Sequence, residues 1–404
     1  MRTDKLLGTR TDKLRNIVRH AHKNSPAFRE RLAGSGLNLE DFREIKDLEK
    51  LPVVRKDNLV DLQGDSPPFG GLLATDINNL HRIFQSPGPI YDPQGGGDDY
   101  WRWGEPLRLA GFGHSDLVVN TFSYHLSPAG FMFDDGLRAV GATVIPTGVG
   151  NTEIQVQIIN DVKVTGFVGT PSFLTALLNK ARELETDFTI RKAFVAAEPF
   201  TPTQRNLFAK NGIDVYQGYG TADVGCIAFE CEKKEGMHVS TDLILEIVDP
   251  DTEKQLPPEE VGEVVVTLFD EAYPLIRLGT GDLSKQVSED CACGLVMERI
   301  EGFMGRIGDA VKVRGLFVHP RQVAEVISGF PELGDFLLEI TRENDRDFMR
   351  LKVEADEARS SESLSESLDE KIRNVLRVRA DSIAFVPKGT LKSGGKIIDL
   401  REWE

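Results

Sequence analysis

Short apolar runs separated by helical stretches constrain the fold of this chain more than any other feature of its sequence. The runs cover residues 117–119, 141–146, 166–168 and 193–197. Between them we expect helices over residues 129–140, 152–160, 171–181 and 202–211. Continuous apolar runs between helices are typical of a parallel sheet that is buried on both faces. The pattern therefore predicts an α/β fold of layered sheets and helices.

The regions on either side of this pattern differ from it, and 404 residues are too many for one ordinary core. Residues 12–32 have apolar side chains at helical spacing, which predicts an N-terminal helical cap. After residue 236 the chain becomes β-rich, with strands expected over 243–248, 262–268 and 274–277. From residue 305 we expect strand, helix (320–328), strand, strand (348–353), helix (364–376) and strand (382–386). We therefore predict a large N-terminal domain of residues 1–305 with a β-rich subdomain, and a small α+β C-terminal domain of residues 306–404.

The charge of the chain is strongly acidic, with 64 Asp and Glu against 48 Lys and Arg and a formal net charge of −16. Such a charge repels a phosphate backbone, so we expect no nucleic-acid partner. The first residues are charged rather than apolar, and no later apolar stretch is long enough to span a bilayer. We therefore expect a cytoplasmic protein without a membrane partner.

The cysteines raise the question of a metal site. Cys231 and His238, followed far downstream by Cys291 and Cys293, supply four soft ligands, a number that suits tetrahedral zinc. Their spacing is not that of a standard zinc finger, so the ligand count leaves scattered buried thiols as an equal alternative. Cys226 is expected in the core.

Six segments carry a resemblance to a known family. They are KLPVVRKDNL (50–59), GATVIPTGVGNTE (141–153), YQGYGTAD (216–223), LGTGD (278–282), GRIGD (305–309) and GTLKSGGK (389–396). Together and in order, they resemble the phenylacetate-CoA ligase branch of the adenylate-forming acyl-CoA synthetases. The resemblance implies an acid–thiol ligase that uses ATP with Mg²⁺ and coenzyme A. An aryl carboxylate would attack the α-phosphate of ATP, and the CoA thiol would then displace AMP after the C-terminal domain has rotated.

The resemblance also implies which residues hold the nucleotide. The wall for adenine and the acyl group would be Ala197, Glu198 and Pro199, and the tyrosine–glycine motif would contribute Gln217, Gly218, Tyr219, Gly220 and Thr221. In the family the tyrosine stacks on adenine, and the acidic residue, here Asp223 in place of glutamate, meets magnesium. Asp282 would accept both ribose hydroxyls, and Arg306 would contact the nucleotide.

Residues of the C-terminal region receive their roles from the same resemblance. Asp309 would be the hinge between two active conformations, and the loop of Lys312, Arg314 and Gly315 would contact coenzyme A. Lys396 would bridge the substrate carboxylate and the α-phosphate, because a fixed cation stabilises the charge that develops at phosphorus.

The acyl pocket and the phosphate loop depart from the family pattern. Phe122, Tyr124, His125 and Ala196 would line the acyl pocket, and since His125 replaces the usual glycine we expect an aromatic ring that bears a polar group. The phosphate loop, residues 85–93, contains three prolines and Asp92 where the family has threonines, glycines and a lysine. Proline lacks an N–H donor, so we expect the chain to bind AMP or an acyl-adenylate better than ATP.

Three functions remain open from the sequence. The leading one is an aryl-CoA ligase. The second is an ATP-independent acyltransferase between aryl-CoA and an acyl-carrier protein or another thiol, and the third is a non-catalytic binder of an aromatic acid or adenylate. The resemblance further implies a homodimer, and some similar proteins carry C-x-C-G at the place of Cys291 and Cys293, which favours structural zinc.

Overall fold

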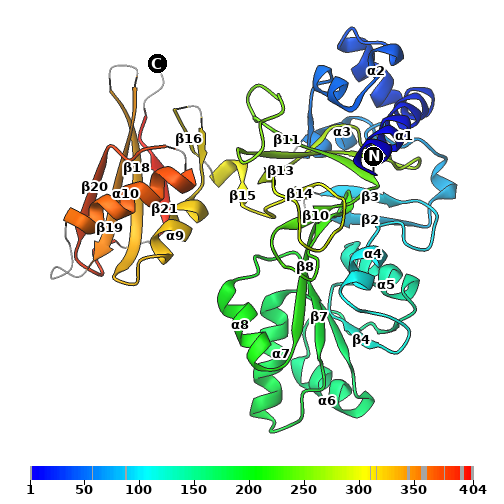
Figure 1. Cartoon of the computed structure of the whole chain (residues 1–404). Coiled ribbons are helices and arrows are strands. Elements are labelled where there is room, and N and C mark those ends of the chain that lie inside the picture. The colour runs from blue at the N-terminus through cyan, green and yellow to red at the C-terminus, as the bar shows by residue number, and fades with distance from the viewer. Residues whose placement is uncertain are drawn as a thin grey trace. The chain divides into compact units, whose positions relative to one another are not determined.

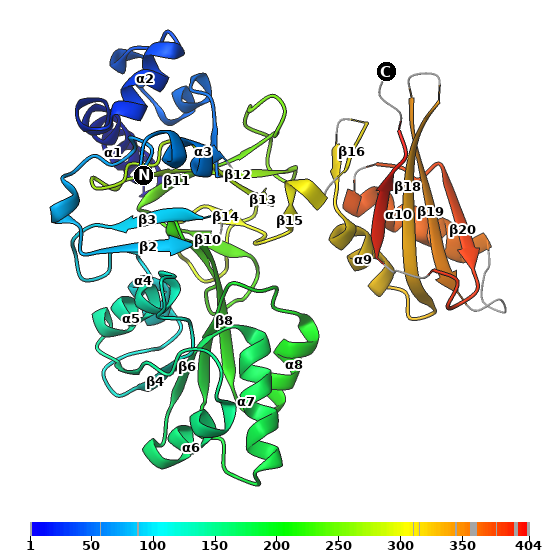
Figure 2. The same cartoon turned by 180° about the vertical axis from the view of Figure 1, so that it is seen from behind.

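A computed structural model of the chain describes residues 2–56, 58–86, 89–309, 311–314, 316–343, 346–355, 362–376, 378–391 and 395–401. The chain forms two compact units. The larger comprises Met1–Glu260, Val264–Thr280 and Lys285–Phe303, and the smaller comprises Val261–Glu263, Gly281–Ser284 and Met304–Glu404. Figures 1 and 2 show the chain from opposite sides, coloured from blue at the N-terminus to red at the C-terminus.

The parallel sheet predicted for the middle of the chain is present in the larger unit. Its strands, in spatial order, are β5 (Thr143–Ile145), β4 (Leu117–Asn120), β6 (Gly166–Gly169), β7 (Lys192–Val195) and β8 (Asp214–Thr221). All four neighbouring pairs run parallel. The apolar runs of the sequence therefore became the central layer of an α/β fold, as expected.

Helices cover both faces of this parallel sheet. Val118 and Val168 pack in one cluster with α4 (Gly104–Leu109) and α5 (Ala129–Ala139). Their neighbours Val119 and Phe167 pack on the other face with three further helices, because successive strand residues point to opposite sides. Those helices are α6 (Thr152–Val162), α7 (Pro171–Glu183) and α8 (Pro202–Lys210). Figure 2 shows α7 and α8 on one side of β8 and α4 and α5 on the other.

The β-rich region continues the same sheet instead of forming a separate one. Beyond β8 the strand order is β9 (Gly225–Phe229), β10 (Met237–Val239), β14 (Arg299–Ile300), β13 (Leu278–Val287), β12 (Val261–Leu268) and β11 (Leu243–Val248). The strand expected over residues 274–277 was wrong, since β13 begins at Leu278. Arg277 has a left-handed φ of 54°, which a strand does not accommodate.

The N-terminal helical cap is present, but it consists of two helices. Residue Ser25 separates α1 (Arg2–Asn24) from α2 (Pro26–Gly34), and its hydroxyl caps α2 by accepting from the N–H of Phe28. Three short 3₁₀ helices, η1 (Leu39–Asp41), η2 (Ile45–Lys50) and η3 (Ile77–Asn79), also lie in this region, with β1 (Val54–Arg55) and α3 (Asn58–Asp65). The predicted phosphate loop, residues 85–93, lies within an antiparallel hairpin of β2 (Arg82–Ser86) and β3 (Ile90–Gln94). Pro87 and Gly88 lie outside the described residues.

The smaller unit has the predicted α+β composition. Its main sheet has the order β20 (Ser382–Val386), β19 (Arg346–Ala355), β18 (Leu333–Glu343) and β21 (Lys396–Asp399), and α9 (Pro320–Ser328) and α10 (Glu362–Leu376) share its core. The unit also contains β15 (Gly305–Arg306), η4 (Ile307–Asp309), β16 (Val311–Val313) and β17 (Leu316–Val318). Across the described residues of both units, no helix is long and apolar enough to cross a membrane.

Candidate active site

The loop after β7 lies at the carboxyl edge of the parallel sheet, where open α/β sheets bind ligands. Its residues Ala197, Glu198 and Pro199 are exposed, and Ala196 before them is buried. Ala197 has φ 69°, a left-handed conformation that is unusual for a residue with a Cβ. The Glu198 carboxylate accepts from the hydroxyl of Ser172 at 2.9 Å, at the start of α7. This contact ties the loop to the start of α7 at the same edge.

The tyrosine–glycine motif is the end of β8, and packing requires both of its glycines. A Cβ on Gly218 would lie 2.6 Å from the Trp103 ring, and one on Gly220 would lie 2.2 Å from a backbone oxygen. The ring of Tyr219 is largely buried, with 7% exposed, and its hydroxyl donates to Thr280 Oγ1 at 3.3 Å. Gln217 is already engaged, because its amide donates to the Glu230 carboxylate at 2.8 Å.

Asp223, on the turn after β8, is the most tightly held of the predicted catalytic residues. Its side chain is fully buried, and it accepts from the hydroxyl of Thr221 at 2.9 Å. Lys56 from the N-terminal segment places its Nζ 3.0 Å from Asp223 Oδ1 and 3.1 Å from Oδ2. The ammonium therefore faces both oxygens of the carboxylate, and only 24% of the Lys56 side chain is exposed.

A second carboxyl group, that of Asp92 on β3, lies within electrostatic range of this pair. Asp92 is 0% exposed, and among the described residues neither of its oxygens has a hydrogen-bond partner. Ser86 lies close enough to lower the pKa of Asp92, but its hydroxyl also has no hydrogen-bond partner among the described residues. Burial, and then the negative charge of Asp223, raises the pKa of Asp92 to about 7, although Lys56 acts in the opposite direction. We call Lys56, Asp92 and Asp223 the carboxylate cluster.

Two predicted nucleotide residues meet in the smaller unit. Asp282 on β13 pairs with Arg306 on β15 through the backbone, and Arg306 Nε lies 3.3 Å from Asp282 Oδ1. The Arg306 side chain is 72% exposed, whereas that of Asp282 is 9% exposed. An exposed guanidinium above a buried carboxylate leaves its remaining N–H groups directed to solvent.

The other predicted residues of the smaller unit lie on separate elements. Asp309 ends η4 and Lys312 lies in β16, while Gly315 falls outside the described residues. Arg314 has φ 51°, and its guanidinium donates to the backbone oxygen of Asp347 and to Asp381, so it is bound within its own unit. Lys396 is exposed and begins β21 opposite Leu337.

The predicted acyl residues follow β4. Phe122 is buried and stacks on Phe133, with ring centroids 4.7 Å apart. Tyr124 is half-buried, donates its hydroxyl to Asp134 at 2.9 Å and accepts from the Asn120 amide at 2.8 Å. His125 is exposed, so it does not line a closed pocket in this conformation.

The four predicted metal ligands converge in the larger unit. The ligand atoms of Cys231, His238, Cys291 and Cys293 all lie within 4.8 Å of one another. The Cys231 and Cys291 sulfurs are 3.6 Å apart, and Cys293 Sγ is 3.4 Å from His238 Nε2. A tetrahedral zinc with bonds of about 2.3 Å to sulfur separates two sulfurs by about 3.8 Å, so the set fits that ion. We call these four residues the thiol cluster. Cys226 lies elsewhere, in the core.

Lys56 and Asp92 were not among the predicted site residues. Lys56 belongs to the KLPVVRKDNL segment, which carries part of the family resemblance, and Asp92 belongs to the phosphate loop, which departs from the family pattern. Nothing in the sequence places either residue beside Asp223, which is 167 positions from Lys56 along the chain. Only the folded chain joins them.

The fold and the site define the class of adenylate-forming enzymes. The family model for AMP-binding enzymes matches residues 131–267, and the model for the C-terminal domain of AMP-binding enzymes matches residues 315–401. A solved structure of an open conformation of 2-hydroxyisobutyryl-CoA ligase in complex with 2-HIB-AMP and CoA has a TM-score of 0.85 and 24% identity. It covers 98% of this chain and 91% of that one. This likeness confirms the predicted fold.

Proteins of similar sequence identify the family within this class. The chain is 30% identical to the phenylacetate-coenzyme A ligase of Thermus thermophilus, over 99% of this chain and 97% of that protein. It is 31% identical to the phenylacetate-coenzyme A ligase of Escherichia coli, over 95% of this chain and 90% of that protein. The chain therefore belongs to the phenylacetate-CoA ligase family, as its motifs predicted, and with it to the acid–thiol ligases of the adenylate-forming class.

Proposed function

We propose that this protein joins an aromatic carboxylic acid to coenzyme A through an acyl-adenylate. The observation that carries the proposal is the buried Asp223, held on the turn after the tyrosine–glycine strand in a member of this family. The acid's carboxylate attacks the α-phosphate of ATP, the bond to pyrophosphate breaks, and acyl-AMP forms. The CoA thiolate then attacks the acyl carbon, and AMP leaves.

Asp223 would hold Mg²⁺, whose charge neutralises the phosphate oxygens; its carboxylate is the hard oxygen ligand that this ion prefers. The other roles follow the family resemblance. Asp282 would accept the ribose hydroxyls, with Arg306 on the nucleotide, and the exposed segment of Ala197, Glu198 and Pro199 would flank adenine. The β8 motif, from Gln217 to Thr221, would form the floor beneath the ring, with Tyr219 against the base.

Residues 306–404 would act as a mobile domain on residues 1–305, with Asp309 as the hinge. In the first step, Lys396 would place its ammonium between the acid and the α-phosphate. In the second, the loop of Lys312, Arg314 and Gly315 would approach coenzyme A. The exposure of Lys396 supports this role, because an exposed ammonium can turn toward a bound nucleotide.

The acid would be an aromatic ring bearing a polar group. Phe122 and Ala196 supply an apolar wall, and Tyr124 supplies a hydroxyl that already bridges Asn120 and Asp134. A hydroxyl or amino substituent on the ring could join this network. The exposed His125 would add a polar edge.

The thiol cluster would hold a structural zinc ion. Burial, and then the charge of Arg299, lowers the pKa of His238, which keeps the imidazole in the neutral form that binds metal. The four ligands come from the turn after β9, from β10 and from the segment between β13 and β14, so one ion would tie together strands that are distant in the sequence.

The test is pyrophosphate release by the purified protein with ATP, Mg²⁺ and each of a series of hydroxy- and aminobenzoic acids. Release with one acid, followed by thioester formation with CoA, is the expected result. Acyl transfer from aryl-CoA to a carrier protein without ATP would instead support the acyltransferase. Tight binding without turnover would support the non-catalytic binder. A cytoplasmic location, a carrier-protein partner and a homodimer stay predictions.

Lys396→Ala separates the two half-reactions. We expect pyrophosphate release to fall by about 100-fold or more, because a preorganised charge at the developing phosphorane contributes about 3–4 kcal/mol. Thioester formation from supplied acyl-AMP should stay within about twofold of wild type. Lys388→Ala, a change in the same unit outside the proposed site, is the control. Equal loss of both half-reactions would remove the role given to Lys396.

A further inference from the structure

The phosphate loop of this chain contains no lysine, yet a lysine from another segment reaches the same region. Residues 85–93 have no cation, and Asp92 is buried there without a hydrogen-bond partner among the described residues. Lys56 comes from the segment between β1 and α3, and its Nζ lies 3.0 and 3.1 Å from the two oxygens of Asp223. A lysine that is three-quarters covered is not an ordinary solvated surface charge.

The backbone that carries Lys56 is fixed to β13. The N–H of Lys56 donates to the Gly279 oxygen at 2.9 Å, and the N–H of Val54 donates to the Arg277 oxygen at 2.9 Å. β1 therefore runs parallel to β13, with Arg55 opposite Gly279. The side chain of Lys56 can turn on its flexible stem, but its Cα cannot move far.

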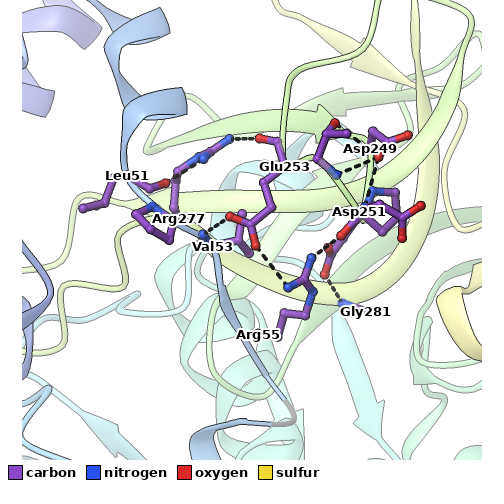
Figure 3. Close-up of polar contacts among 12 residues, drawn as sticks. Leu51, Val53, Arg55, Asp249, Asp251, Glu253, Arg277 and Gly281 are labelled. Carbon is purple, nitrogen blue, oxygen red and sulfur yellow. Dashed lines mark hydrogen bonds and ion pairs between the residues drawn. The ribbon is translucent and has the colours of Figure 1, made fainter. Parts of the chain in front are cut away.

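A buried network fixes the residues just before Lys56 (Figure 3). Arg277 is 0% exposed, pairs with Glu246 at 3.0 Å and donates to the backbone oxygens of Leu51 and Glu253, each at 2.7 Å. The Glu253 carboxylate in turn accepts from the N–H of Val53 at 2.9 Å and from Arg55 at 3.1 Å. These contacts hold the backbone at Leu51 and Val53 and the side chain of Arg55 in place.

The carboxylate cluster has one ammonium for two carboxyl groups. With both carboxyls ionised, its net charge is negative, which is unfavourable for a buried group and for phosphate binding. A divalent metal ligated by Asp223 would place its positive charge beside the same two oxygens that Lys56 Nζ now approaches at 3.0 and 3.1 Å, and the two cations would repel each other. Metal binding would therefore release the ammonium of Lys56 while neutralising the carboxylate.

We propose that Lys56 binds the phosphate chain of the nucleotide: it neutralises Asp223 while no metal is bound and turns to the phosphates when Mg²⁺ takes its place. The inference rests on the proposed adenylation function and supplies the cation that the phosphate loop lacks. The ammonium stays close to the phosphates after the exchange because β1 is clamped to β13. No covalent step is required of it.

The test compares Lys56→Gln, Lys56→Arg and the matched control Lys192→Gln. Glutamine keeps hydrogen-bond donors but removes the charge, and arginine keeps the charge. Lys192 is a suitable control because it pairs with Asp116 at 3.1 Å in the same unit with 28% exposure. Melting temperatures identify variants that fail to fold, and titration calorimetry gives affinities for Mg²⁺·ATP and for AMP.

We expect Lys56→Gln to weaken Mg²⁺·ATP binding by about tenfold and to change AMP binding by less than about twofold, since one charge-assisted contact to phosphate is lost. Lys56→Arg should recover most of the affinity for ATP, and Lys192→Gln should behave as wild type. The half-saturating Mg²⁺ concentration should fall in Lys56→Gln, because the metal no longer competes with an ammonium.

Three outcomes overturn the inference. If ATP and AMP binding weaken equally in Lys56→Gln, or if the Mg²⁺ requirement rises, Lys56 is only a structural partner of Asp223. Pyrophosphate release by the wild-type protein distinguishes this result from failure of the proposed function. If the wild-type protein turns over but the ratio of ATP to AMP affinity is unchanged in Lys56→Gln, only the role of Lys56 is rejected. A wild-type protein that neither binds ATP nor releases pyrophosphate rejects both.

Discussion

The thiol cluster and the carboxylate cluster lie in the same unit but differ in how their charge is balanced. The thiol cluster consists of four soft ligands whose ligand atoms all lie within 4.8 Å of one another, a spacing that fits a tetrahedral ion. The carboxylate cluster contains its own cation, the ammonium of Lys56. A permanent structural ion therefore suits the thiol cluster, whereas an exchangeable ion suits the carboxylate cluster.

The largest effect expected from this contrast is loss of the structural ion. Cys291→Ser should abolish stoichiometric zinc and lower the free energy of unfolding by about 4 kcal/mol or more, because metal binding of this kind is coupled directly to folding. Metal analysis by mass spectrometry and denaturant unfolding with and without a chelator measure it. Cys226→Ala, at a buried core thiol outside the cluster, should lose stability but keep its zinc. If the metal content of Cys291→Ser is unchanged, the thiol cluster does not hold the zinc ion.

Asp223→Asn tests the carboxylate cluster independently of the thiol cluster. Zinc content should stay at the wild-type level, while pyrophosphate release falls by about 100-fold, equivalent to about 2.7 kcal/mol, because the amide is a poor ligand for Mg²⁺. Single-turnover assays of both half-reactions measure the effect. Asp116→Asn, which alters another buried partner of a lysine, is the control and should leave the rate nearly unchanged. Loss of zinc in Asp223→Asn would mean that the two clusters are not independent.

A smaller effect concerns the protonation of Asp92. The pKa of Asp92 is about 7 in the folded protein against 3.8 for a solvent-exposed aspartate, so the unfolded chain ionises first and stability is lost as pH rises between those values. Asp92→Asn removes this penalty, so the stability of the variant relative to wild type should increase as pH rises from about 4 to about 7 and stay constant above that. Thermal unfolding across this range checks the prediction. A stability difference that does not depend on pH would show that Asp92 is not protonated in the folded state.

Much of the fold could be predicted because apolar periodicity is local. The runs at 117–119 and 166–168 became β4 and β6, and the helix from Pro320 to Ser328 was predicted with its observed bounds. Prediction failed where the backbone conformation of single residues decides the outcome. The break at Ser25 and the left-handed Arg277 depend on a cap and on a buried ion pair that the helical or strand pattern does not reveal.

The candidate site divides in the same way. Motif order along the chain was enough to predict the family and to select Asp223, Asp282 and Arg306, and ligand count was enough to suggest the thiol cluster. Spacing alone did not decide between a zinc site and scattered buried thiols, because residues 231 and 293 are far apart in sequence. Their convergence follows from the antiparallel pairing of β9, β10 and β14.

The sequence by itself determined the α/β class, the family and the chemistry of the side chains available to the site. Only the tertiary structure decided which charges meet. Lys56 reaches Asp223 because β1 adds to β13 and the buried Arg277 holds the preceding residues. Asp92 is buried near them because the phosphate loop forms a hairpin. Electrostatic interactions depend on distance and burial, and neither quantity is encoded in the order of residues along the chain.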